Sequence, residues 1–192
     1  MPTPSTRVAE LRAITPMEGD LNSAKIEKLF TSADIQQRVK ELAAEISNDF
    51  SEYELHIVGV LKGAFIFLAD LVRFVTVPCF VHFIHAASYG NQKTSSGTVR
   101  IEQALDLKDK HILIVEDIVD TGLTLSQIVC EFKKQKPASL DICTLLDKPE
   151  RREVVVDVQY TGFTIADYFV VGYGIDFAEQ YRELPYIARL ND

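Results

Sequence analysis

Apolar residues along the chain follow two spacings, one typical of helices and one of buried strands. From Asp34 to Phe50 they recur three or four positions apart, which predicts an amphipathic helix capped by Thr31 or Ser32. Continuous apolar runs of five or six residues predict strands buried on both faces, as in a parallel sheet. The predicted strands are 56–61, 79–85, 98–102, 111–115 and 140–146, the further helices are 64–74 and 124–134, and 167–172 is one more apolar run. This alternation predicts an α/β fold with a mainly parallel central sheet.

Length and composition favour one globular domain. The chain has 192 residues, of which 47% are hydrophobic and 25% charged. Residues 1–24 contain three prolines, a glycine and little apolar periodicity, which predicts a loosely docked leader. No apolar run approaches the roughly 18 residues that span a bilayer. Three widely spaced cysteines favour reduced core residues over a disulfide framework. We therefore expect a cytoplasmic protein without a membrane partner.

The net charge argues against one class of partner. Twenty Lys and Arg against 28 Asp and Glu give a formal charge of −8. This sign disfavours general electrostatic binding of nucleic acid. A polyphosphate ligand would need backbone amides, a few well-placed cations or a metal ion.

The segment from Val115 to Thr124 carries the clearest candidate chemistry. Glu116 and Asp117 follow the predicted strand 111–115, and a small polar turn, 120–124, opens the next helix. Open α/β sheets bind their ligands at this carboxyl edge. Backbone amides and hydroxyls at a helix N-terminus suit a phosphate, and carboxylates accept hydrogen bonds from sugar hydroxyls. The segment therefore predicts a ribose phosphate site.

A plainer interpretation of the same segment is a solvated loop with a helix cap. The two commonest phosphate loops are absent from the sequence. It contains no G-x-x-x-x-G-K-[ST], and Gly172-Tyr173-Gly174 lacks the third glycine of a dinucleotide fingerprint.

A resemblance favours the ribose phosphate site over the solvated loop. The segment 115–124 resembles the signature of the type I phosphoribosyltransferases, and further motifs match in the same order along the chain. Most of the chain is similar to their hypoxanthine (hypoxanthine-guanine) branch. The matching segments are the helix 35–50, Leu61-Lys62-Gly63-Ala64, Ser88-Tyr89-Gly90, Leu146-Asp147-Lys148, 169–176 and Tyr181-Arg182. The resemblance implies a type I phosphoribosyltransferase fold, with a mainly parallel sheet flanked by helices. It also implies a small hood built from the chain ends and the segment after 148.

The resemblance implies a purine salvage reaction. The 5-phosphoribosyl group of phosphoribosyl pyrophosphate passes to hypoxanthine or guanine, giving IMP or GMP and pyrophosphate, with Mg²⁺ as cofactor. Asp120 would act as general base at the purine N7. Glu116 and Asp117 would hold the ribose hydroxyls and, with Asp176, the metal. The 5′-phosphate would lie against Asp120, Thr121, Gly122, Leu123 and Thr124.

Further roles are implied at the other motifs. Pyrophosphate would bind at Leu61, Lys62, Gly63 and Arg182, where the peptide joining the first two is often cis in the family. Lys148 would donate to the 6-oxygen of the purine, Phe169 would stack on the base, and the Val170 carbonyl would accept from the guanine amino group. Ser88 and Tyr89 would belong to a loop that closes over the site. The sequence departs from some relatives at Ala64, commonly a glycine, and at Leu123, where the mammalian type has a lysine.

The resemblance also implies a homodimer or homotetramer. Two alternatives stay open from the sequence. One is a xanthine-preferring enzyme, because xanthine also carries a 6-oxygen. The other is a nucleotide-sensing, RNA-binding regulator on the same fold, which the charge of −8 disfavours.

Overall fold

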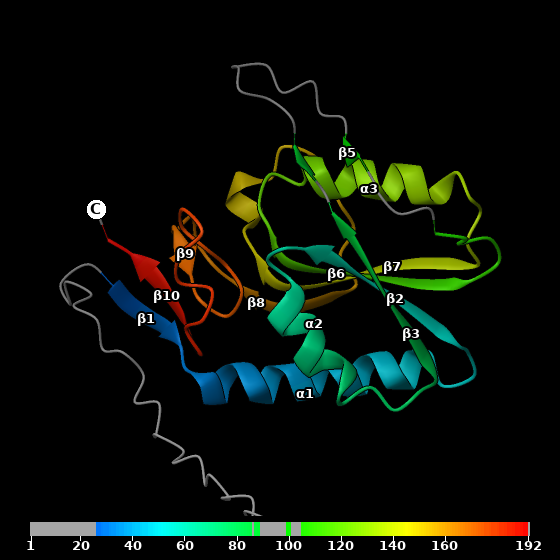
Figure 1. Ribbon diagram of the computed structural model, residues 1–192, viewed down its shortest axis with the longest axis horizontal. Coiled ribbons are helices and arrows are strands. Elements are labelled where there is room, and N and C mark those ends of the chain that lie inside the picture. The colour runs from blue at the N-terminus through cyan, green and yellow to red at the C-terminus, as the bar shows by residue number, and fades with distance from the viewer. Residues whose placement is uncertain (1–25, 86, 89–98, 101–104, 192) are drawn as a thin grey trace, which may run out of the picture.

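A five-stranded parallel sheet forms the centre of the computed structural model, which describes residues 26–85, 87–88, 99–100 and 105–191 (Figure 1). Its strand order is β3-β2-β6-β7-β8, and every neighbouring pair is parallel. The strands are β2 (Leu55–Leu61), β3 (Cys79–His85), β6 (His111–Val119), β7 (Ser139–Asp147) and β8 (Tyr160–Thr164). All five carboxyl ends therefore lie at one edge of the sheet, where such folds bind ligands.

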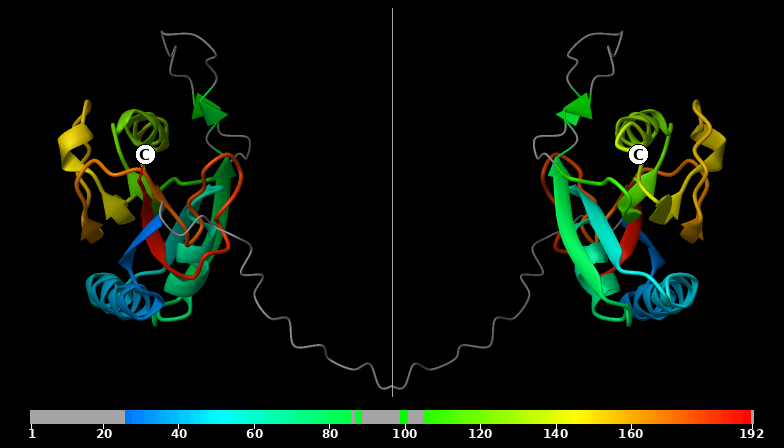
Figure 2. Two further views of the ribbon diagram at one scale, coloured as in Figure 1. Left: turned by 90° about the vertical axis from the view of Figure 1, so that its left-hand side faces the viewer. Right: turned by 90° about the vertical axis from the view of Figure 1, so that its right-hand side faces the viewer.

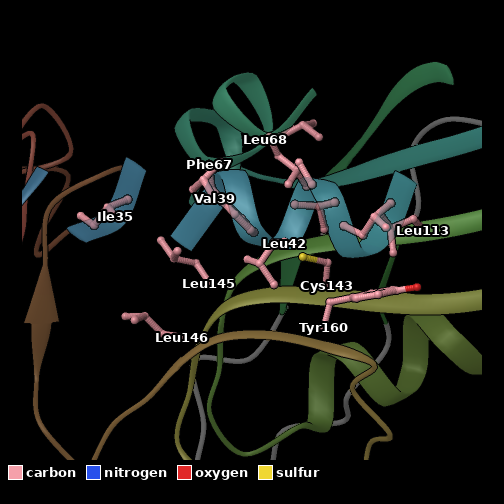
Figure 3. Close-up of a cluster of buried hydrophobic side chains, with 14 of the residues drawn as sticks. Ile35, Val39, Leu42, Phe67, Leu68, Leu113, Cys143, Leu145, Leu146 and Tyr160 are labelled. Atoms are coloured by element: carbon pink, nitrogen blue, oxygen red, sulfur yellow. The ribbon is translucent and has the colours of Figure 1, made fainter. Parts of the chain in front are cut away.

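Helices cover both faces of this sheet (Figure 1). Helices α1 (Ser32–Asp49) and α2 (Phe65–Val72) pack on one face, and α3 (Leu123–Lys133) packs on the other. Helix α1 begins at a capping box, in which Thr31 Oγ1 accepts from the Asp34 amide and the Asp34 carboxylate accepts from the Thr31 amide. Each face holds its own buried apolar cluster, and Figure 3 shows the one beneath α1.

A second, antiparallel sheet lies beside the first (Figures 1 and 2). Its order is β1-β10-β9, formed by β1 (Ile26–Phe30), β10 (Ile187–Leu190) and β9 (Val170–Val171). Residues from both ends of the described chain thus pair directly, with Ile26 opposite Leu190. The short strands β4 (Ala87–Ser88) and β5 (Val99–Arg100) pair with each other, and η1 (Pro149–Arg151) is a single 3₁₀ turn.

The predicted fold class is confirmed, and several predicted boundaries are wrong. Strand β6 continues to Val119, because Glu116, Ile118 and Val119 keep their pairing with β7, so the acidic pair lies in a strand and not in a turn. Strands β1, β4, β8 and β10 were not predicted, and the run 167–172 forms only the two-residue β9. Cys130 is exposed, contrary to a core position. The leader 1–24 and residues 98, 101 and 102 lie outside the described residues.

None of the helices in the described part of the chain has the length and apolarity needed to cross a membrane.

Candidate functional site

The first candidate pocket opens at the carboxyl ends of β2 and β6 and has a volume of ≈ 230 Å³. It brings together residues from the 61–63 loop, from the acidic end of β6 and from the turn before α3. The predicted site residues that line it are Leu61, Lys62, Gly63, Glu116, Asp117, Asp120, Thr121, Gly122 and Thr124. Leu123 is the one member of the predicted 120–124 phosphate set outside this lining.

The turn before α3 leaves the helix N-terminus open towards the pocket. Gly122 precedes the helix with φ +82°, and a Cβ there would lie 2.5 Å from the Val154 carbonyl oxygen, so only glycine fits. No side chain caps the helix. The Leu123 amide donates to Thr121 Oγ1 at 3.3 Å, which stabilises the turn. An uncapped helix N-terminus with its positive dipole end suits a phosphate.

Glu116 and Asp117 form a coupled carboxyl pair in the pocket wall. Burial, and then the neighbouring charge of Asp117, raises the pKa of Glu116 well above its usual range. Burial also raises the pKa of Asp117, while the hydrogen bond from Glu116 opposes this shift. Two carboxyl groups so close hold a proton readily, and a ligand that donates hydrogen bonds or brings positive charge would relieve their repulsion.

Gly63 fits tightly between two other segments of the site. A Cβ on it would lie 1.7 Å from Asp117 Oδ2, well inside any real contact. Gly174, which has φ +99°, also lies close to Gly63, since a Cβ on it would lie 2.3 Å from the Gly63 carbonyl oxygen. These two distances show that the 61–63 loop is in close contact with the acidic end of β6 and with the 172–174 turn. The Leu61–Lys62 peptide bond in this loop is cis.

The two predicted pyrophosphate cations lie near this loop and share one carboxylate. Lys62 Nζ lies 3.0 Å from Glu179 Oε2, and Arg182 Nη2 lies 3.6 Å from the same oxygen. Arg182 also contacts Asp176 Oδ1 at 2.7 Å and donates to the Gly174 carbonyl at 2.7 Å. Sequence reasoning missed Glu179, since only the fold brings it to Lys62.

A second pocket, of ≈ 390 Å³, contains the predicted base-binding residues. Lys148 lines it and is only 5% exposed, and burial lowers the pKa of its ammonium group. Phe169 lines the same pocket and is 53% exposed, so its ring is free to stack on a ligand. The Val170 side chain is buried in β9.

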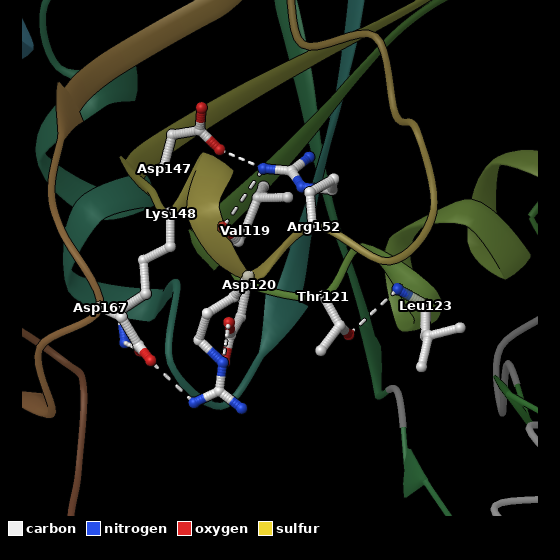
Figure 4. Close-up of polar contacts among 9 residues, drawn as sticks. Val119, Asp120, Thr121, Leu123, Asp147, Lys148, Arg152 and Asp167 are labelled. Carbon is white, nitrogen blue, oxygen red and sulfur yellow. Dashed lines mark hydrogen bonds and ion pairs between the residues drawn. The ribbon is translucent and has the colours of Figure 1, made fainter.

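The two pockets meet at Asp120, which lines the first, and Arg151, which lines the second. Arg151 Nε lies 3.1 Å from Asp120 Oδ1. Figure 4 shows Asp120 in the same view as Lys148 and Asp167. Arg151 was given no role in the sequence analysis. Its position three residues after the predicted base-contacting lysine was the one available signal.

The remaining predicted residues are only partly described. Ser88 lies in β4 opposite Val99, and Tyr89 lies outside the described residues. Asp176 is engaged by Arg182 and by the Glu179 amide, which donates to Asp176 Oδ2 at 2.9 Å. Within the described residues, no three His, Cys, Asp or Glu side chains cluster as a complete metal site.

Comparison with known proteins identifies relatives of one family. The family model of the phosphoribosyl transferase domain matches residues 25–178 of this chain. A hypoxanthine phosphoribosyltransferase of Haemophilus influenzae is 46% identical over 86% of this chain and 95% of its own. A hypoxanthine-guanine phosphoribosyltransferase of Bacillus subtilis is also 46% identical, over 86% and 93%. The crystal structure of a hypoxanthine phosphoribosyltransferase from Staphylococcus aureus matches with a TM-score of 0.86 and 40% identity, covering 91% of this chain and 96% of that one.

Proposed function

Since the chain belongs to the phosphoribosyltransferase family, we propose that its two adjoining pockets hold the two substrates of one transfer reaction. The chain is a purine salvage enzyme of the hypoxanthine (hypoxanthine-guanine) branch. It transfers the 5-phosphoribosyl group of phosphoribosyl pyrophosphate to hypoxanthine or guanine and forms IMP or GMP and pyrophosphate. The proposals below assign this chemistry to individual residues.

The observation that carries the assignment is the meeting of an uncapped helix N-terminus, a carboxyl pair and a buried lysine around Asp120. The turn 120–124 would bind the 5′-phosphate through its amides and hydroxyls. Glu116 and Asp117 would accept hydrogen bonds from the ribose hydroxyls. With the phosphate held at the turn and the hydroxyls held at the carboxyl pair, the anomeric carbon would face the base pocket.

The base would bind in the second pocket. The Lys148 ammonium donates hydrogen bonds and cannot accept one, so it favours a 6-oxygen over a 6-amino group. Phe169 would stack on the purine ring, and the Val170 carbonyl would accept from the amino group of guanine. The sheet β1-β10-β9 would then serve as the hood over the base.

The pyrophosphate group would bind at Leu61, Lys62, Gly63 and Arg182. Lys62 and Arg182 lie close enough to share the Glu179 carboxylate, so they lie close enough to share one diphosphate. Closure of the segment that holds Ser88 and Tyr89 would exclude water, which protects an electron-poor sugar from hydrolysis.

The carboxyl pair also fits a divalent cation, because both groups line the pocket and carboxylate oxygens are the ligands that Mg²⁺ prefers. Mg²⁺ keeps several ligands from water and substrate, so an incomplete protein set suits it. Glu116 and Asp117 would hold the ion. Asp176, the third residue that the resemblance implies at the metal, does not cluster with them in the described structure and is paired with Arg182. When bound, the ion would neutralise charge on the pyrophosphate leaving group.

Asp120 would act as general base, sharing the proton at the purine N7 while the glycosidic bond forms. The test is Asp120→Asn, which keeps the shape of the side chain and removes its basicity. Turnover should fall about 10²- to 10⁴-fold with donor affinity retained. Asp106→Asn, an exposed aspartate outside both pocket linings, is the matched control. Parent-level turnover in Asp120→Asn would refute the assignment.

Base preference is tested directly by comparing kcat/KM for hypoxanthine, guanine and xanthine at saturating donor and magnesium. We expect the first two to exceed xanthine. The reverse order would identify a xanthine-preferring enzyme on the same fold.

We also propose a homodimer or homotetramer in the cytoplasm. Edge strand β3 exposes Phe80, Val81 and Phe83 and contains no Lys, Arg, Asp or Glu that would discourage strand pairing. The cysteines of the described chain are free, as in a reducing compartment. A light-scattering mass equal to one chain would refute the oligomer.

A further inference from the structure

Four charged side chains of alternating sign connect the two pockets. Arg151 Nε lies 3.1 Å from Asp120 Oδ1, and Arg151 Nη1 lies 3.5 Å from Asp167 Oδ1. Lys148 Nζ lies 3.9 Å from that same Asp167 oxygen. The series therefore runs Asp120, Arg151, Asp167, Lys148. It joins the turn 120–124 to the segment before Phe169.

Backbone hydrogen bonds fix the position of the 3₁₀ turn η1, which carries Arg151, next to the turn 120–124. The Lys148 amide donates to the Val119 carbonyl at 2.9 Å. On the other side of η1, the Glu153 and Val154 amides both donate to the Thr121 carbonyl, at 3.0 and 3.1 Å. The 3₁₀ turn that carries Arg151 is thus attached at both ends to the residues flanking Asp120. This double attachment makes the approach of the guanidinium to Asp120 a consequence of the fold.

The contact matters because Asp120 Oδ1 is buried and makes no hydrogen bond within the described structure. Arg151 Nε lies 3.1 Å from it without forming a hydrogen bond, so the contact is an ion pair. In the described residues, Arg151 is the only cation within ion-pair distance of Asp120. A carboxylate that must reach a purine nitrogen therefore takes its orientation from this one side chain.

The neighbouring arginine does different work. Arg152 pairs with Asp147 and reaches the Val119 carbonyl at 3.4 Å, so it holds the end of β6 to the end of β7 (Figure 4). Of the two arginines, only Arg151 contacts Asp120 and Asp167. The pair of arginines thus divides into one that fastens strands and one that faces the reacting groups.

We propose that Arg151 is a positioning residue for the transfer reaction, which holds the Asp120 carboxylate towards the purine and links it to the Asp167–Phe169 segment. This inference rests on the proposed role of Asp120. Arg151 acts through Asp120 and not on the substrate, so its loss lowers kcat and leaves KM for phosphoribosyl pyrophosphate near the parent value.

The experiment compares Arg151→Gln and Arg151→Lys with Glu150→Gln, an exposed neighbour in the same turn. Misplacing a reacting group by a fraction of an ångström lowers the rate, and we expect kcat for Arg151→Gln to fall about tenfold. Arg151→Lys keeps the charge and should recover part of this loss. Glu150→Gln should match the parent, which shows that the turn tolerates substitution.

A double-mutant cycle with Asp120→Asn tests the mode of action. If Arg151 works through the Asp120 carboxylate, Arg151→Gln has little further effect on kcat in the Asp120→Asn background. An equal fold-loss in both backgrounds, or unchanged kcat in Arg151→Gln alone, overturns the inference while leaving the proposed function intact. Full turnover in Asp120→Asn instead overturns the general-base role and the inference with it.

Discussion

Replacement of Gly63 by alanine should lower both activity and stability, through a clash that is local to the site. The added Cβ would lie 1.7 Å from Asp117 Oδ2 and 2.4 Å from its Cγ. The loop has little room to move, because the Gly63 carbonyl oxygen already lies so close to Gly174 that a Cβ there would be 2.3 Å away. The Asp117 side chain must therefore move.

The magnitude follows from that displacement. Asp117 Oδ2 must withdraw from 1.7 Å to the 3.4 Å at which ordinary contact begins. Misplacement of a binding group by about 1 Å can lower the rate about 10²-fold, so we expect kcat/KM for phosphoribosyl pyrophosphate to fall by roughly that factor. Overpacking costs about 1–3 kcal/mol of unfolding free energy, which corresponds to a fall in Tm of roughly 2–12 °C.

The assay pairs steady-state kinetics with thermal unfolding and uses Gly162→Ala as its control. A Cβ on Gly162 would lie 2.4 Å from the Leu145 carbonyl oxygen, where β8 pairs with β7, outside both pocket linings. This control should lose comparable stability and keep its kcat/KM below Tm. If Gly63→Ala retained parent kinetics, the tight contact with Asp117 would have no bearing on catalysis.

Three further predictions follow from single residues. Lys148→Met should lower kcat/KM for hypoxanthine at least tenfold without lowering Tm, because the pKa of Lys148 is depressed by burial and an apolar side chain removes that cost; a fall in both would point to a structural role. The raised pKa of Glu116 gives stability that is full below pH ~4.5 and lost as pH rises through the raised value. As the pH rises from 5 to 8, the urea midpoint of Glu116→Gln should therefore increase relative to that of the parent. Midpoints that change in parallel with pH would contradict this. Glu179→Gln should tighten pyrophosphate binding about two- to fivefold in calorimetry, since an exposed ion pair is weak and releases Lys62 and Arg182; unchanged affinity would show that Glu179 does not compete.

Elements with a strong apolar period could be predicted from the sequence. The helix expected at 34–50 is α1, and the runs at 56–61 and 111–115 are β2 and the first part of β6. Strands β1, β8 and β10 carry mixed residues over four or five positions, and they are strands only because a distant partner completes their hydrogen bonds. The residues within such a strand do not indicate which distant segment will pair with it.

The site could be predicted where its residues are adjacent in sequence, as from Glu116 to Thr124. Contacts made by the fold were out of reach. Nothing local indicates that Gly63 meets Asp117 or that Glu179 reaches Lys62, since these pairs are separated by 54 and 117 positions. The same reasoning misread the end of β6, because two acids suggest a solvated turn unless the pairing with β7 is known.

The pairing of β1 with β10 also sets an order of events during synthesis. Residues 26–30 leave the ribosome more than 150 residues before 187–190, so the first strand of the smaller sheet waits unpaired until almost the whole described chain has been made. The parallel sheet and its helices can assemble in that interval. Translation therefore completes the antiparallel sheet last, and a nascent chain that already contains the turn 120–124 still lacks the residues 189–191 that line the second pocket beside Phe169.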